Sequence, residues 1–125
     1  MSAIIFENDK FLVEKRKKDE PRDPGITCLP GGHVEANETR EEALVREMRE
    51  ELDIKVKKAE LITNGLWIAS DGERQKVYYY LVTEYIGKPT CKVAKKILYI
   101  KDISAIDIEA DRKAIRKTIS YFKKH

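Results

Sequence analysis

One stretch decides how this chain folds: GHVEANETREEALVREMREELDI, from Gly32 to Ile54. Its second half predicts a helix that begins near Thr39, because the threonine hydroxyl can cap the first turn and Glu42 completes a capping box. At about 100° per residue, four apolar side chains fall on one arc of that helix: Leu44, Val45, Met48 and Leu52. The stretch therefore predicts an amphipathic helix that packs with this arc facing inward.

Three glutamates share the face beside that arc. Glu47, Glu50 and Glu51 stand at positions i, i+3 and i+4, which brings their side chains together. On open solvent a helix tolerates such like charges at roughly a few tenths of a kcal/mol per pair, whereas a buried cluster requires protonation or a metal. Because 38% of the chain is charged, a solvated helix face is the simpler interpretation of the carboxylates alone. The alternative is a site for Mg²⁺ or Mn²⁺, hard cations that take oxygen ligands.

The spacing around these glutamates favours the cation site. Gly32 is followed after five residues by Glu38 and after seven more by Arg46, which opens the run REMREELDI. This order closely resembles the signature box of the Nudix hydrolases, and the LPGG that ends at Gly32 is similar to the MutT-like members. The resemblance implies an α/β fold of the Nudix type: an α/β/α sandwich with a mixed β-sheet between helices.

The resemblance also implies an activity and its residues. It implies Mg²⁺-dependent hydrolysis, with Mn²⁺ as the other possible ion, in which water attacks a nucleoside diphosphate linked to a further group. Metal charge would neutralise developing negative charge and activate the water. By position, the metal ligands are the Gly32 carbonyl, Glu47, Glu50 and Glu51, the catalytic candidates are Glu47, Arg46 and Glu50, and Glu38 pairs with Arg46 to brace the loop against the helix.

Substrate contacts are expected outside the box. Arg16 matches a strand arginine that contacts phosphate in similar proteins. Trp67 and one of Tyr78, Tyr79 and Tyr80 could stack on a nucleobase, although core packing is the competing interpretation for most of the four. Strand alternation places Tyr79 on the face opposite the other two tyrosines.

Two features depart from the family pattern. Asp53 stands where the family has glycine, at a position that needs a left-handed backbone, which aspartate tolerates better than most residues. Some members carry an extra acid before the last strand, but residues 87–101 contain neither Asp nor Glu. The general base is then in the box, Glu47 by preference, or in the loop that holds Asp71 and Glu73.

The flanking sequence predicts the remaining elements of a single domain over residues 1–125. Alternating apolar runs bounded by turn residues indicate strands, and an amphipathic pattern near the C-terminus indicates a second helix. The strands are expected at 3–6, 11–15, 26–29, 61–69, 77–85 and 97–100, the second helix at 111–124 with Ala114, Ile115, Ile119 and Phe122 inward, and an exposed loop at 19–25.

Composition limits the partners and the compartment. A formal net charge of +3, with 25 basic against 22 acidic residues, gives a mixed surface, so no stable nucleic-acid complex is expected. Cys28 and Cys91 lie far apart without a CxxC motif, which fits a reducing cytosol. The N-terminus shows neither a signal peptide nor a membrane span, so a cytoplasmic protein is expected. Self-association into a homodimer stays open.

The substrate is a small nucleotide whose identity the residues leave open. Chain length and the LPGG loop favour a nucleoside triphosphate, as in MutT-like members. Dinucleoside polyphosphates and RNA 5′ ends are alternatives within the family. A non-catalytic Nudix domain that senses a nucleotide is a further alternative, although such a sensor has no need for all three box glutamates.

Overall fold

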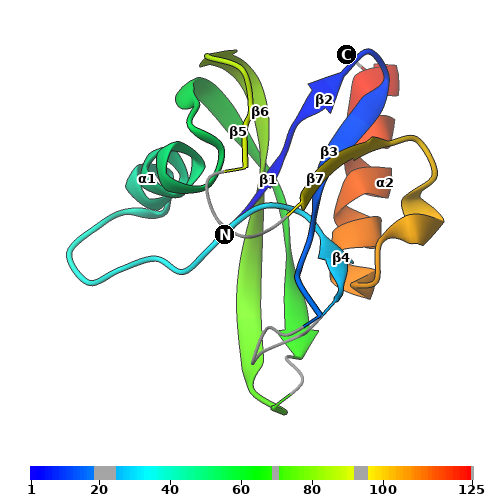
Figure 1. Cartoon of the computed structure of the whole chain (residues 1–125), viewed down its shortest axis with the longest axis horizontal. Helices are drawn as coiled ribbons and strands as arrows, with labels where there is room; N and C mark the ends of the chain where they lie inside the picture. The colour runs from blue at the N-terminus through cyan, green and yellow to red at the C-terminus, as the bar shows by residue number, and fades with distance from the viewer. Residues whose placement is uncertain (19–24, 69–70, 92–95, 125) are drawn as a thin grey trace.

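The structure, a computed structural model, describes residues 1–18, 25–68, 71–91 and 96–124. Figure 1 shows helices and strands in a layered arrangement. In chain order the elements are β1 (Ser2–Ile4), β2 (Phe6–Glu7), β3 (Lys10–Lys15), β4 (Thr27–Cys28), α1 (Arg40–Leu52), β5 (Lys55–Ile68), β6 (Arg74–Ile86), β7 (Lys96–Ile100), the 3₁₀ turn η1 (Ile103–Ala105) and α2 (Glu109–Lys124).

The strands form two hydrogen-bonded sheets. In the first, β6 lies between β1, which runs parallel to it, and β5, which runs antiparallel to it. In the second, β3 pairs antiparallel with β2, β4 and β7. The chain passes from β1 to β2 through Ile5, whose carbonyl accepts a hydrogen bond from the Leu12 amide at 3.0 Å. The two sheets are thus joined at their N-terminal strands.

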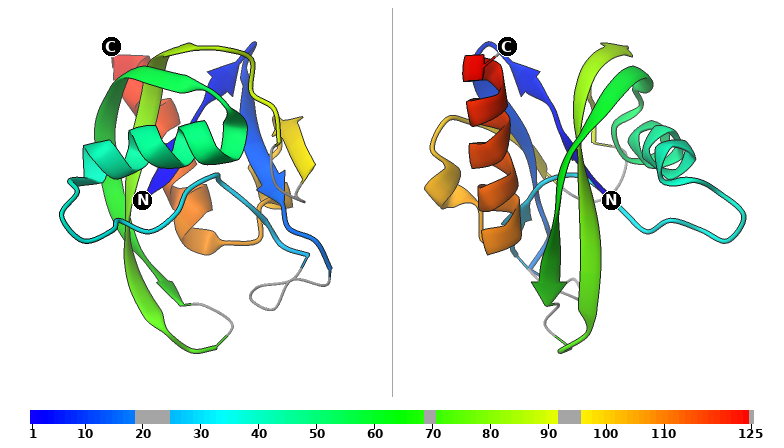
Figure 2. Two further views of the ribbon diagram at one scale, coloured as in Figure 1. Left: turned by 60° about the vertical axis from the view of Figure 1, so that its left-hand side comes forward. Right: turned by 180° about the vertical axis from the view of Figure 1, so that it is seen from behind.

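Both sheets together form the middle layer between the helices, as two further views make clear (Figure 2). Successive side chains of a strand point to opposite faces, so Ala3 and Leu12 pack in the core cluster under α1, whereas Ile4 and Val13 pack in the cluster under α2. The expected α/β/α sandwich with mixed strand directions is therefore confirmed. The layer that the sequence suggested as one sheet consists of two.

The ends of α1 follow the local signals in the sequence. The Thr39 hydroxyl accepts from the Glu42 amide at 3.1 Å, and the Glu42 carboxylate accepts from the Thr39 amide at 2.9 Å, so the capping box is confirmed. Asp53 ends the helix in the left-handed region with φ 56° and ψ 37°, as expected. The predicted inward arc is right for three of its four residues, but Val45 is exposed, because Ala43 takes its place in the core.

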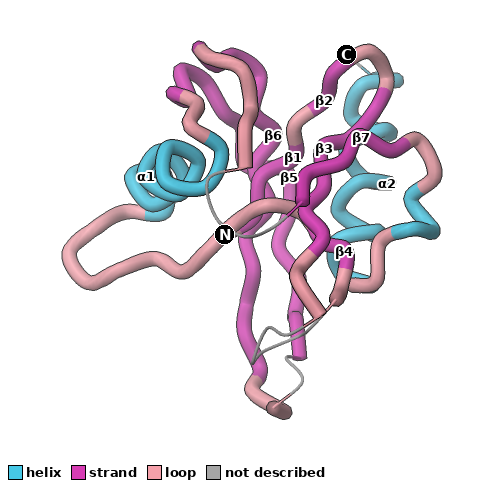
Figure 3. Tube along the Cα trace, viewed as in Figure 1, coloured by secondary structure: helices cyan, strands magenta, loops and turns pink. Residues whose placement is uncertain are grey.

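Several predicted boundaries differ from the observed ones (Figure 3). β5 starts at Lys55, six residues before the predicted start, because this edge strand faces solvent and shows no clear alternation there. In α2, Ala114 and Ile115 are buried as predicted, whereas Ile119 and Phe122 are exposed. The loop expected at 19–25 lies outside the described residues except for Gly25. No described helix is long and apolar enough to span a membrane.

The short β1 strand creates the opening that becomes the site. Its three residues pair only with Tyr79 to Leu81 of β6, so β6 residues 74–78 extend beyond the end of β1. On its other edge β1 pairs with the loop that precedes α1: the Ala3 amide donates to the Pro30 carbonyl at 2.8 Å, and the Gly32 amide donates to the Met1 carbonyl at 3.0 Å. The loop between β4 and α1, residues 29–39, is called the box loop below, and these bonds fix it beside the opening.

Candidate active site

A pocket of about 990 Å³ lies where β1 ends, and its size falls within the usual range for small-molecule sites. Its walls come from β3, the box loop, α1, the facing ends of β5 and β6, and the start of α2. Residues far apart in the sequence, such as Arg16, Glu47 and Asp111, line this one space.

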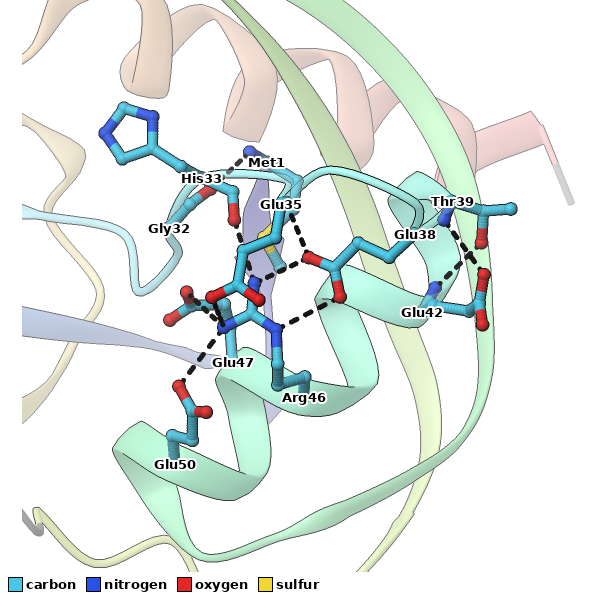
Figure 4. Close-up of polar contacts among 10 residues, drawn as sticks. All are labelled: Met1, Gly32, His33, Glu35, Glu38, Thr39, Glu42, Arg46, Glu47 and Glu50. Atoms are coloured by element: carbon cyan, nitrogen blue, oxygen red, sulfur yellow. Dashed lines mark hydrogen bonds and ion pairs between the residues drawn. The ribbon is translucent and has the colours of Figure 1, made fainter.

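Arg46 ties the box loop to α1 at the side of this pocket, and Figure 4 shows it at the centre of the contacts. Its guanidinium donates to both carboxylate oxygens of Glu38, from Nε at 3.1 Å and from Nη2 at 2.7 Å. Nη2 also donates to the His33 carbonyl at 2.9 Å, and Nη1 donates to Glu47 at 3.0 Å and to Glu50 at 3.2 Å. The Arg46 hydrogen bond lowers the pKa of Glu38. This geometry fits the bracing role predicted for Arg46 and Glu38.

Glu47 lies directly against Gly32. A Cβ atom at Gly32 would lie only 2.3 Å from the Glu47 carboxyl carbon, so the absence of a side chain makes room for the carboxylate. The Glu47 side chain is 13% exposed. Burial raises the pKa of its carboxyl group, and the hydrogen bond from Arg46 opposes that rise. Glu47 is thus a partly desolvated carboxylate in contact with the loop whose carbonyl was predicted to bind metal.

The other two box glutamates are placed differently from each other. Glu51 lines the same pocket as Glu47, and its Oε2 atom is buried. The Glu50 side chain is 59% exposed and accepts from Arg46. Among the described residues, no three His, Cys, Asp or Glu side chains are gathered closely enough to hold a metal ion. The structure therefore brings Gly32, Glu47 and Glu51 to one pocket, whereas Glu50 does not line it.

These donors fit a hard divalent cation in their chemistry. They are carboxylate and carbonyl oxygens, which Mg²⁺ and Mn²⁺ prefer. The Gly32 carbonyl already accepts a hydrogen bond at 2.8 Å from the positively charged Met1 amine, so this position tolerates a cation. The proximity of Glu51 and Glu50 raises the pKa of Glu47, which shows that negative charge accumulates here. Glu47 and Glu50 both accept from Arg46, and the Gly32 carbonyl accepts from Met1, so these contacts would have to rearrange for the whole set to hold a cation.

Three of the four residues predicted as substrate contacts or alternative bases line the pocket. Arg16 at the end of β3 and Trp67 near the end of β5 both line it. Trp67 additionally packs against the core cluster under α2, so it serves the core and the pocket together. Glu73 lines the pocket, whereas Asp71 accepts a hydrogen bond from the Glu73 amide at 3.0 Å and does not line it.

Two buried acids in the pocket wall were missed by sequence reasoning. Asp111 is 4% exposed, and its carboxylate accepts from the Tyr79 hydroxyl at 2.6 Å and from the Leu29 amide at 3.0 Å. Burial raises the pKa of Asp111, and these hydrogen bonds oppose the rise. Glu14, on β3, is 3% exposed and also lines the pocket. The one available signal was that Glu14 directly follows the apolar residues Phe11 to Val13 within a predicted strand, which could have indicated a buried acid.

The tyrosines alternate as predicted. Tyr79 packs in the cluster under α2, whereas Tyr78 and Tyr80 pack with the cluster under α1. Tyr78 lines the pocket, and Tyr80 donates to Glu41 at 3.3 Å. Core packing is therefore the main role of Tyr79 and Tyr80, and Tyr78 is the tyrosine whose ring borders the pocket.

The chain is similar to proteins of known activity over part of its length. The nucleoside triphosphatase NudI of Enterobacter sp. (strain 638) is 40% identical over 83 residues, which are 66% of this chain and 57% of that protein. The ADP-ribose pyrophosphatase of Methanocaldococcus jannaschii is 47% identical over 51 residues, 41% of this chain and 29% of that protein. The chain thus spans less than two thirds of the length of either curated relative.

Solved structures and a family model extend the likeness beyond the box. The MutT NUDIX hydrolase from Burkholderia pseudomallei superposes with a TM-score of 0.80 at 28% identity, covering 93% of each chain. A model of the NUDIX domain matches residues 1–97, which contain the box, β1 to β6 and most of the pocket wall. The chain therefore belongs to the Nudix family.

Proposed function

We propose that this chain is a metal-dependent pyrophosphohydrolase that cleaves nucleoside triphosphates. The observation that carries the proposal is the desolvated Glu47 carboxylate held against Gly32 inside a pocket of nucleotide size. Membership of the Nudix family supports phosphoanhydride hydrolysis. Similarity to a nucleoside triphosphatase and to a MutT structure supports a triphosphate as substrate.

The residues that would hold the cation, Mg²⁺ or Mn²⁺, are Gly32 through its carbonyl, Glu47, Glu50 and Glu51. A divalent cation at this place supplies positive charge that offsets the charge gained by phosphate oxygens in the transition state. Glu47 is the preferred general base, accepting a proton from the attacking water on a carboxylate oxygen. Its place in the pocket wall, partly shielded from solvent and held against Gly32, favours this role.

Arg46 acts as a positioning residue. Its five hydrogen bonds fix the loop that carries Gly32 relative to the helix that carries Glu47 and Glu50. Such fixed geometry matters because small displacements of catalytic groups reduce rates steeply. On the substrate side, Arg16 contacts phosphate, and Trp67 offers an aromatic surface to the nucleobase. We assign these roles to one catalytic domain that comprises residues 1–125.

The test is Glu47→Gln, which keeps the shape of the side chain and removes its charge. If Glu47 is a ligand or base that acts mainly in the transition state, kcat should fall by at least about 100-fold while nucleotide binding changes little. The measurement is Mg²⁺-dependent hydrolysis of dGTP, with product identification and binding titration. A variant with parental kcat would contradict the assignment.

Glu73→Gln is the companion variant, because Glu73 is the acid of the β5–β6 loop that lines the pocket. A larger loss of kcat in this variant would move the general base to that loop. ADP-ribose belongs in the same substrate panel, since one similar protein is named for its action on it. We also propose a cytoplasmic location, because two cysteines far apart in the sequence without a CxxC motif are typical of proteins from a reducing compartment.

A further inference from the structure

Arg40 occupies an unusual environment at the first turn of α1. Its guanidinium carbon lies 3.9 Å from the centre of the Tyr78 ring, within the range of a cation–π interaction. Its Nε atom donates to the Tyr80 hydroxyl at 3.1 Å. Both tyrosines come from β6, so this strand provides two contacts that fix the position of the guanidinium. Arg40 and Tyr78 both line the pocket.

Arg40 differs in its partners from Arg46 on the same helix. All three guanidinium nitrogens of Arg46 donate to acceptors, most of them carboxylate oxygens. Within the described residues, Arg40 makes no ion pair, and its two Nη atoms donate no hydrogen bond. The carboxylate of Glu41, the next residue along the helix, accepts from Tyr80. Arg40 therefore presents an oriented fork of N–H donors, the arrangement that recognises phosphate and carboxylate groups.

A second cation converges on the same ring. The Lys76 ammonium lies 5.5 Å from the centre of the Tyr78 ring and also lines the pocket. Lys76 forms no ion pair with the part of the chain that the structure describes. Two positive side chains beside one ring repel each other, and no carboxylate of the described residues is paired with either. An anionic ligand would relieve this repulsion and use the donors of both.

The position of Arg40 along α1 indicates which part of a bound ligand would contact it. Arg40 and Glu47 are two helical turns apart on one face, a rise of roughly 10 Å. An extended group beginning at Glu47 and Glu51 would therefore reach Arg40 at its far end.

We propose that Arg40 and Lys76, ordered by Tyr78, bind the distal anionic group of the substrate. This subsite selects a nucleoside diphosphate extended by phosphate over one extended by a neutral sugar. The inference rests on the proposed function, since it names the chemistry of the group beyond the diphosphate. It also distinguishes between the activities for which two similar proteins are named, nucleoside triphosphate and ADP-ribose cleavage.

The test compares the parent with Arg40→Gln and Lys76→Gln, with Mg²⁺ present. Binding of inorganic tripolyphosphate should weaken by about 10- to 100-fold in Arg40→Gln, the loss expected for charge-assisted hydrogen bonds, and by a smaller factor in Lys76→Gln. The value of kcat/KM for dGTP should fall in parallel, while that for ADP-ribose should change less than about threefold, because its distal sugar makes no such bonds.

Arg49→Gln is the matched control, because Arg49 is exposed on the same helix and does not line the pocket. It should leave tripolyphosphate binding and both kcat/KM values unchanged. Lys76 is exposed, so its variant tests the subsite even if Arg40→Gln proves unstable in thermal unfolding. Unchanged tripolyphosphate binding in folded Arg40→Gln and Lys76→Gln, or equal losses for dGTP and ADP-ribose, overturns the inference. If the parent cleaves neither nucleotide, the proposed function fails, and tripolyphosphate binding alone decides on the subsite.

Discussion

Replacing Gly32 by alanine should remove activity while leaving the fold intact. The new Cβ would lie 2.3 Å from the carboxyl carbon of Glu47 and 2.4 Å from its Oε1 atom. Carbon contacts need about 3.5 Å, so the carboxylate must move by roughly 1 Å. The obstacle is the far end of a flexible side chain, and Gly32 does not have a positive φ, so the backbone can accept alanine.

This displacement of the Glu47 carboxylate should lower both the stability and the catalytic rate. Glu47 would lose its hydrogen bond from Arg46, currently 3.0 Å long, at a cost of at most about 3 kcal/mol in the free energy of unfolding. A misplacement of about 1 Å can lower a catalytic rate by roughly 100-fold. We therefore expect a folded variant with about 1% of parental kcat for dGTP and a smaller rise of melting temperature on addition of Mg²⁺. Thermal unfolding and steady-state kinetics measure both.

Gly31→Ala is the matched control. Its Cβ would lie 2.1 Å from the Met1 carbonyl oxygen and 2.9 Å from the Ser2 Cα atom, so backbone rather than a flexible side chain must give way. Overpacking of this kind costs typically about 1–3 kcal/mol, and the hydrogen bonds between β1 and the loop would weaken as well. Gly31→Ala should therefore melt lower than Gly32→Ala. A Gly32→Ala protein that keeps kcat within about threefold of the parent, or melts below Gly31→Ala, would refute the reasoning.

Two further predictions concern buried charge. Burial raises the pKa of Asp111, so the stability that this group contributes is present in acid and is lost as the pH rises through the folded pKa. The Tyr79 hydroxyl donates to the ionised Asp111 and offsets part of this loss, and Tyr79→Phe removes that hydrogen bond. Its deficit in unfolding free energy, about 1.5–3 kcal/mol at neutral pH, should shrink towards pH 4, and equal deficits at both pH values would contradict this. For the box, Glu51→Gln should raise the melting temperature in EDTA by relieving repulsion with Glu47. The parent should gain about 2.7 kcal/mol at a hundredfold excess of Mg²⁺ over its dissociation constant, and an equal gain in the variant would indicate a solvated face.

Local signals predicted α1 well because its ends depend on neighbours in sequence. The reciprocal bonds of Thr39 and Glu42 span three residues, and the left-handed Asp53 is bonded to the preceding turn. The Glu38 and Arg46 pair was predicted from family resemblance, and the structure places the two in contact. The sequence alone was sufficient to predict features that depend on hydrogen bonds between residues close together in the chain.

Prediction failed where position depends on the whole fold. The first residues of β5 were missed because an edge strand with lysines at 55, 57 and 58 has too little buried surface for alternation. Asp111 resembles any charged residue at a helix start, and only packing against Tyr79, thirty-two residues away, reveals it as a buried acid. Likewise, nothing near Arg40 in the sequence indicates that β6 supplies its aromatic partner.

The short pairing of β1 with β6 also bears on how the chain acquires its pocket during folding. β5 and β6 are sequence neighbours and can form a hairpin early, because short loops close at low entropic cost. Ser2 must find Tyr79 across most of the chain before the Pro30–Gly32 loop has a strand to pair with, and such distant contacts form slowly. In a refolding experiment, fluorescence of the single tryptophan, Trp67 on β5, should therefore recover before nucleotide hydrolysis does.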